Sequence, residues 1–129
     1  MERTNNLIIG IENPLLDIQI DIDTLDLLHK YELTHGQACL AVDKHQPLFA
    51  EIWASDKKVV VPGGSSLNSI RAANHMLKNV HPGKCAFIGS IGNDEVGRVL
   101  QDELRNTGIE GAFHIDPETP TGSCAVIIH

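Results

Sequence analysis

Aromatic residues, cysteines and long apolar runs are all scarce in this sequence. Phe, Trp and Tyr make up 4% of its 129 residues, so the chain offers few rings on which nucleic-acid bases can stack. Its three cysteines, Cys39, Cys85 and Cys124, are widely spaced and odd in number, which indicates neither a disulfide framework nor a zinc site. No run reaches the roughly 20 apolar residues that a membrane-spanning helix needs, and the first six residues lack the layout of a secretion signal. We therefore expect a protein of the reducing cytoplasm.

The charge of the chain is acidic overall. Its 10 Lys and Arg residues against 17 Asp and Glu residues give a formal net charge of −7. This balance disfavours nucleic acids and anionic membranes as partners. The seven histidines form no H-x-x-x-H pair, so we expect no metal site among them. With 42% hydrophobic residues, the chain has enough apolar material for a domain with an aliphatic core.

A short turn rich in glycine and serine separates an apolar run, Val59–Val61, from a helical pattern. The pair Gly63-Gly64 allows positive φ angles and close approach of a ligand, and Ser65 or Ser66 is suited to cap the helix. Backbone N–H groups at such a helix start attract polar or anionic ligands, and the Asn68 amide lies one turn further on. The helix itself is predicted from apolar residues at steps of three and four: Leu67, Ile70, Ala73, Met76, Leu77 and Val80. The same residues also fit an ordinary strand-to-helix turn without a ligand.

Predicted strands and helices alternate along the chain. Continuous apolar runs at 7–11 and 85–89 predict strands that are buried on both faces, and 112–115 predicts a short strand. Alternating patterns predict half-exposed strands at 16–22, 57–61 and 123–128, while 37–42 is ambiguous. Helical spacing predicts helices at about 24–30, 47–54, 67–80 and 94–104, the first capped by Thr24 and the last by Asp94 or Asn93. This order indicates an α/β fold with a parallel sheet and a second, smaller sheet.

The sequence ends inside the last predicted strand. Ser123 to Ile128 is apolar enough to need a neighbour on its open edge, and only His129 follows it. From this we expect the 129 residues to be the front portion of a longer protein.

Three motifs in order along the chain resemble the ribokinase-type (phosphofructokinase B) carbohydrate kinase family. They are Asn-Pro-Leu-Leu-Asp-Ile at 13–18, Gly-Gly-Ser-Ser-Leu-Asn at 63–68 and Ile-Gly-Asn-Asp-Glu-Val-Gly at 91–97. Weaker similarities lie at 43–45 with 48–49, and at 120–125. Each motif alone is short, but together, at suitable spacing, they cover almost the whole chain.

The resemblance implies a ribokinase-like doubly wound α/β sheet, of which residues 1–129 are the N-terminal part, with a small β lid. The lid segments would be approximately 16–22, 37–42, 57–61 and 123–128. The opening at 13–17 and the region 43–45 favour the branch of the family that phosphorylates the 5′-hydroxyl of adenosine with ATP and Mg²⁺. The resemblance further implies a cytoplasmic monomer of purine salvage.

The resemblance also assigns residues to the nucleoside. Asp17 would accept hydrogen bonds from the two ribose hydroxyls, a task that suits a carboxylate; its alternative role is a solvated carboxylate on a half-exposed strand. Leu40 and Cys124 would pack against the base, although Cys124 also suits plain core packing. The remaining residues assigned to the sugar are Asn13, Gly63, Gly64, Ser65 and Asn68. Asp94 is assigned no chemistry beyond capping.

The family's Asp-Thr-x-Gly-Ala-Gly-Asp motif, which carries the anion hole and the catalytic base, is absent from this sequence. We therefore expect no catalytic residue here, and an inactive chain when it is isolated. Two alternatives stay open: a ribokinase or fructokinase of the same family, and a non-catalytic α/β binding module. A dinucleotide-binding domain is disfavoured because no Gly-x-Gly-x-x-Gly follows the first strand.

Overall fold

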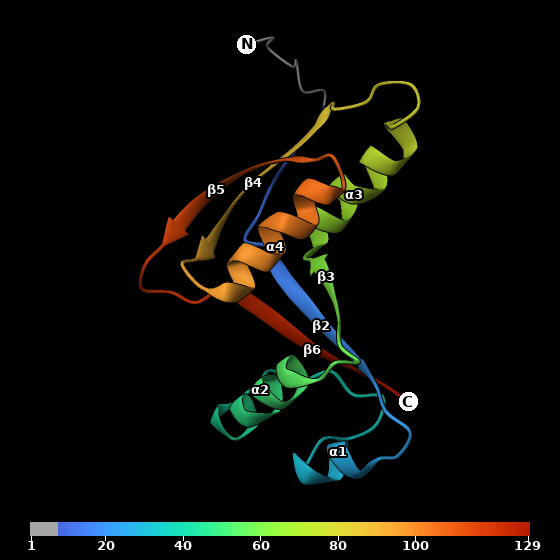
Figure 1. The fold of residues 1–129 in the computed structure, drawn as a ribbon, viewed down its shortest axis with the longest axis vertical. Coiled ribbons are helices and arrows are strands. Elements are labelled where there is room, and N and C mark those ends of the chain that lie inside the picture. The colour runs from blue at the N-terminus through green and yellow to red at the C-terminus, as the bar shows by residue number, and fades with distance from the viewer. Residues whose placement is uncertain (1–7) are drawn as a thin grey trace. The chain divides into compact units, whose positions relative to one another are not determined.

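The computed structural model describes residues 8–129 as two three-stranded sheets with four α-helices and one 3₁₀ turn (Figure 1). The elements in chain order are β1 (Ile8–Ile11), β2 (Leu15–Asp21), α1 (Asp26–Lys30), η1 (Asp43–His45), α2 (Gln46–Ala54), β3 (Val59–Gly63), α3 (Ser65–Leu77), β4 (Cys85–Gly92), α4 (Glu95–Asn106), β5 (Glu110–Asp116) and β6 (Gly122–Ile128). The mixed α/β class predicted from the sequence is confirmed. No helix among the described residues has the length and apolar character to cross a membrane.

The chain divides into two structural units. Among the described residues, the first comprises residues 8–16 together with Val61–Ser123, and the second comprises Asp17–Val60 together with Cys124–His129. The division therefore falls inside β2, β3 and β6, the three strands of one sheet.

The first unit is built on a parallel sheet with the order β1-β4-β5. Ile8 pairs with Cys85, and Ala86 pairs with Glu110. Helix α3 contacts β1 and β4, and α4 contacts β4 and β5. The core lies between the helices and the sheet and consists of Leu67, Ile70, Cys85, Phe87, Leu104 and Ile109. This confirms the parallel sheet and the aliphatic core, with Phe87 as the aromatic exception.

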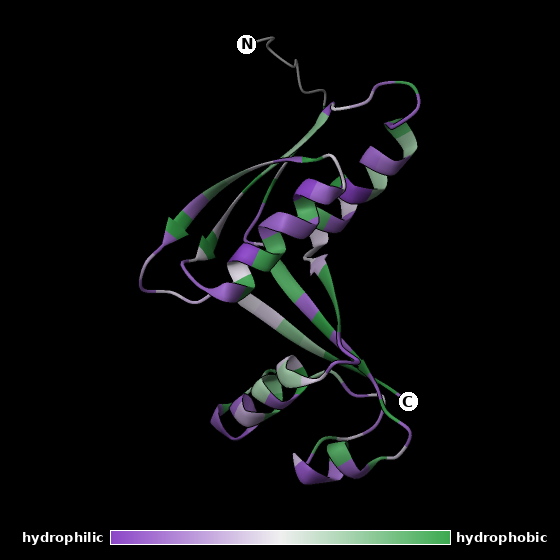
Figure 2. Ribbon diagram, viewed as in Figure 1, coloured by the Kyte–Doolittle hydropathy of each residue, from purple (hydrophilic) through white to green (hydrophobic). Residues whose placement is uncertain are grey.

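Helix α4 shows how the pattern of the sequence sets the packing. Figure 2 shows hydrophobic and hydrophilic residues alternating along this helix. Leu100 and Leu104 are buried, whereas Arg98 and Asp102 are exposed. The spacing of three to four residues places the two leucines on one stripe of the helix, and this stripe packs on the sheet.

One prediction for this sheet is wrong. Strand β1 was expected to be buried on both faces, yet Ile9 and Ile11 are exposed, Ile11 by 73%, and Ile88 beside it on β4 is also exposed. The reason is that these residues lie on the alternate positions of their strands, and within the described residues no helix covers them. Leu7, which the same prediction included, lies outside the described residues.

Three element boundaries also differ from the prediction. Helix α3 ends at Leu77, so Met76 is 79% exposed and Val80 lies beyond the helix. Strand β4 continues through Ser90 to Gly92, beyond the predicted end at residue 89, because pairing with β5 extends to Asp116. Helix α1 begins after Leu25, and no side chain caps it.

The second sheet has the order β3-β2-β6. It confirms the prediction that the half-exposed strands form a separate small sheet. On β2, Leu16 and Ile18 are buried while Asp17 and Gln19 are only partly buried, which is the alternation expected of a strand with one wet face. Residues 37–42, which were ambiguous, form neither a helix nor a strand.

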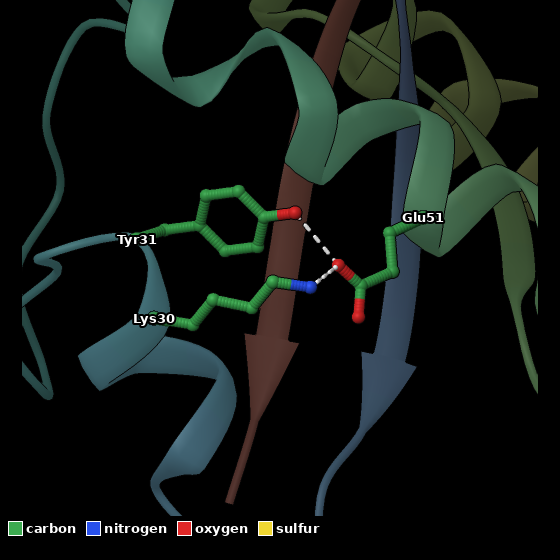
Figure 3. Close-up of polar contacts among 3 residues, drawn as sticks. All are labelled: Lys30, Tyr31 and Glu51. Atoms are coloured by element: carbon green, nitrogen blue, oxygen red, sulfur yellow. Dashed lines mark hydrogen bonds and ion pairs between the residues drawn. The ribbon is translucent and has the colours of Figure 1, made fainter.

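Helices α1 and α2 of the second unit are linked through one carboxylate (Figure 3). Glu51 Oε2 accepts hydrogen bonds from Lys30 Nζ at 2.7 Å and from Tyr31 Oη at 2.6 Å. The hydrogen bond from Lys30, followed by the one from Tyr31, holds the pKa of Glu51 below its usual value. Because Lys30 and Glu51 are well exposed to solvent, their ion pair contributes little to stability.

Candidate functional site

The turn between β3 and α3 has the geometry expected of its two glycines. Gly64 is the residue before the helix and has φ of 107°, a conformation that side chains rarely adopt. Its carbonyl oxygen accepts the first helical hydrogen bond, from Asn68 N at 2.9 Å. Pro62 and Gly63 are buried, and Gly64 is partly buried. The positive φ predicted for this turn is therefore confirmed at Gly64.

The start of α3 is capped by a residue that the sequence did not single out. Ser65 and Ser66 already belong to the helix, so the prediction that one of them is the cap is wrong. The side chain of Glu12 takes this role: its Oε1 accepts from Ser65 Oγ at 2.7 Å and its Oε2 accepts from Ser66 N at 2.7 Å. These hydrogen bonds, the one from Ser65 first, hold the pKa of Glu12 below its usual value.

The segment that contains Asn13 lies directly beside the glycine turn. Glu12 N donates to Ile88 O at 3.1 Å, which fixes this segment to β4. A Cβ on Gly64 would lie 3.1 Å from Glu12 Oε2 and 3.6 Å from Pro14 Cα, so the two backbones approach each other closely. Asn13 itself is exposed. The first unit thus brings together two of the motifs that lie about 50 residues apart.

The side chain of Asn68 contacts Arg71, one turn further along helix α3. Its Oδ1 accepts from Arg71 Nη1 at 3.3 Å, and the same guanidinium nitrogen donates to Pro62 O at 2.7 Å. Arg71 is partly buried and so connects the end of β3 with the first turns of α3. Asn68 is exposed, and its amide nitrogen is able to donate a hydrogen bond to a ligand hydroxyl.

Asp17, Leu40 and Cys124 belong to the second unit. Asp17 on β2 is partly buried, and Cys124 is exposed on the neighbouring strand β6, which contradicts a core-packing role for this cysteine. Desolvation, and then the charge of Asp17, raise the pKa of the Cys124 thiol. Leu40 is 91% exposed in the irregular segment 37–42.

Asp94 is the helix cap that the sequence predicted, and it does more. Its carboxylate accepts from Gly97 N at 2.7 Å, from Thr121 N at 2.8 Å and from Thr121 Oγ1 at 2.7 Å. Thr121 Oγ1 in turn accepts from Gly92 N at 2.9 Å. Burial raises the pKa of Asp94, but these hydrogen bonds outweigh burial and the pKa lies below its usual value. The carboxylate therefore joins the β4–α4 turn to the loop before β6.

The comparison with known protein families decides the assignment. The sequence pattern described as "pfkB family carbohydrate kinase" matches residues 34–129. The chain belongs to the pfkB family of carbohydrate kinases. Solved structures of adenosine kinases match 95% of the chain, which confirms the ribokinase-like fold expected from the three motifs.

Several adenosine kinases in this family are similar to the chain. The adenosine kinase of Dictyostelium discoideum is 37% identical over 126 residues, which cover 98% of this chain and 36% of that protein. The apo structure of Trypanosoma brucei brucei adenosine kinase matches with a TM-score of 0.87 and 32% identity, over 95% of this chain and 37% of that one. The structure of Schistosoma mansoni adenosine kinase in complex with adenosine matches with a TM-score of 0.76 and 30% identity, over 94% and 35% of the two chains. This pfkB-family chain thus spans about a third of the length of the relatives it matches.

Proposed function

We propose that this chain is the nucleoside-binding part of an adenosine kinase, which transfers the γ-phosphoryl group of ATP to the 5′-hydroxyl of adenosine and releases AMP and ADP. The observation that carries the proposal is the geometry of the first unit, in which the Asn13 segment and the Gly63-Gly64 turn lie side by side. The similarity to adenosine kinases over nearly the whole chain supports it. We further propose a monomer that acts in purine salvage in the cytoplasm.

In this proposal the chain contributes binding and orientation. Asp17 accepts hydrogen bonds from the ribose diol, because a carboxylate can take both neighbouring hydroxyl protons. Asn13, Ser65 and the amide of Asn68 contribute polar contacts around the sugar, and the backbone of Gly63 and Gly64 approaches it closely. Leu40 and Cys124 pack against the base. Correct placement of the acceptor hydroxyl is much of what a kinase must achieve, because phosphoryl transfer depends on positioning and charge stabilisation.

The proposal assigns the described residues to the nucleoside and not to the phosphates of ATP or to Mg²⁺. Within residues 8–129 no group of three His, Cys, Asp or Glu side chains is placed to hold a metal ion. The start of α3, which could otherwise attract phosphate, is already taken by the Glu12 carboxylate. The proposal therefore routes no step through Mg²⁺ on these residues, and it assigns them the acceptor alone.

The test is product formation by the full-length protein. We expect adenosine, ATP and Mg²⁺ to give AMP and ADP in equal amounts, detected by chromatography, with no AMP when either ATP or adenosine is omitted. ADP without AMP, or no conversion, would overturn the proposed activity.

The 129-residue chain expressed alone should be inactive and should self-associate. It has no Gly-Ala-Gly-Asp motif for phosphate and base, and Ile9, Ile11 and Ile88 expose an apolar patch on one face of the sheet. Light scattering over a range of protein concentrations should show particles that grow with concentration. A monomer that unfolds cooperatively, or turnover above a control without protein, would contradict this prediction.

A further inference from the structure

Glu12 is a charged residue that the proposed reaction does not yet use, although it lies at the glycine turn. Its Oε2 is 3.1 Å from the position that a Cβ of Gly64 would take, and its two carboxylate oxygens bind Ser65 Oγ and Ser66 N, each at 2.7 Å. Helix α3 has 13 residues and carries no acidic residue of its own in the first turn. Glu12 therefore supplies the negative charge at this end of the helix.

The position of this charge has a chemical consequence. The positive end of a helix dipole and its free N–H groups favour an anion, and here a carboxylate from the same chain already satisfies both. A second anion at the turn, such as a phosphate group, would lose the Ser66 N–H and would meet the charge of Glu12. An uncharged hydroxyl carries no such repulsion.

We propose that Glu12 is a specificity-determining residue of the acceptor site: it makes the Gly63-Gly64 turn accept an uncharged ribose hydroxyl and exclude one that carries a phosphate. This inference rests on the proposed function, because that function places the ribose hydroxyls at the turn. It goes beyond it by naming a second carboxylate, besides Asp17, that disfavours nucleotides phosphorylated on the ring hydroxyls.

The test uses the full-length protein and Glu12→Gln, with Glu95→Gln as the matched control. Glutamine has the shape of glutamate and can still accept from Ser66 N, so the turn is retained while the charge is lost. Glu95 is also an acidic residue in the first turn of a helix of the same unit, and it is exposed. The probes are adenosine 2′-monophosphate and adenosine 3′-monophosphate, and binding is measured by calorimetry without ATP.

We expect Glu12→Gln to bind at least one of these probes about tenfold more tightly than the wild type, and Glu95→Gln to bind both like the wild type. The affinity for adenosine should change much less than that for the phosphorylated probes. A gain for the phosphorylated probes without a matching gain for adenosine distinguishes specificity from a purely structural cap, because a loosened turn would affect both kinds of ligand. Melting temperatures of the three proteins, measured alongside, verify that the variants are folded.

Unchanged affinity for both probes in Glu12→Gln would overturn the inference and leave Glu12 as a helix cap. An equal gain in Glu95→Gln would overturn it as well, because the effect would then come from net charge. Because binding is measured without turnover, these outcomes are separate from failure of the proposed function, which is absence of AMP formation by the wild type.

Discussion

Replacement of Asp17 by alanine in the full-length protein is expected to lower kcat/KM for adenosine more than a hundredfold. In the proposed site, the variant leaves two ribose hydroxyls without an acceptor. A hydrogen bond to a charged group contributes roughly 1.5–3 kcal/mol, so the loss is about 3 kcal/mol or more of transition-state stabilisation. The measurement is steady-state kinetics with adenosine as the varied substrate.

The controls for this prediction are a second variant on the same strand and a second substrate. Leu16 and Ile18 supply the buried face of β2 and Asp17 lies on the opposite face, so its removal should change the free energy of unfolding by about 1 kcal/mol or less. Asp21→Ala, a matched change further along β2 at an exposed position, should leave kcat/KM near the wild-type value. The wild-type preference for adenosine over 2′-deoxyadenosine should shrink in Asp17→Ala. Kinetics like those of the wild type would show that Asp17 is a solvated strand carboxylate.

Among the variants named here, Asp94→Ala is expected to lose the most stability, about 2–4 kcal/mol in the free energy of unfolding. The substitution removes a helix cap and the acceptor of both Thr121 hydrogen bonds. Thr121 is buried, so its N–H would lose its partner without gaining full access to water. Urea unfolding measures the effect. Glu95→Ala, the neighbouring acidic residue without such contacts, should cost less than about 0.5 kcal/mol. Equal stability of the two variants would contradict the role given to Asp94.

The same carboxylate predicts a pH dependence with a defined sign. The pKa of Asp94 in the folded protein lies below its ordinary value of 3.8, so the ionised form is favoured by folding. The stabilisation is then fully present above about pH 5 and is lost progressively as the pH falls through 3.8 and then through the lower, folded-state pKa. The difference in unfolding free energy between the wild type and Asp94→Ala should therefore shrink over this acid range. If this difference stayed constant from about pH 6 down to the pH at which the protein unfolds in acid, the role of the ionised Asp94 carboxylate would be contradicted.

The features that could be predicted from the sequence are those that depend on local pattern. The parallel sheet follows from the order of the chain, in which apolar strands alternate with amphipathic helices. The positive φ of Gly64 follows from two glycines at the end of a strand. The Asp94 cap follows from the position of this residue directly before α4.

The features that could not be predicted depend on residues far apart in the chain. Glu12 caps a helix whose first residues lie 53 and 54 positions away, and Thr121 binds a carboxylate 27 positions away. Nothing in the local pattern around Glu12 distinguishes it from a polar residue after a strand. The exposure of Ile9 and Ile11 has the same origin, because burial of a strand face depends on which element packs on it and not on the strand's own composition.

The central claim is that the protein containing this chain phosphorylates adenosine in preference to a free sugar. The most direct test gives the full-length protein an equimolar mixture of adenosine, ribose and fructose with limiting ATP and Mg²⁺, and identifies the phosphorylated product by mass spectrometry. We predict that AMP takes nearly all of the transferred phosphate. A ribose or fructose phosphate as the main product would contradict the claim and would assign the chain to a sugar kinase of the same family.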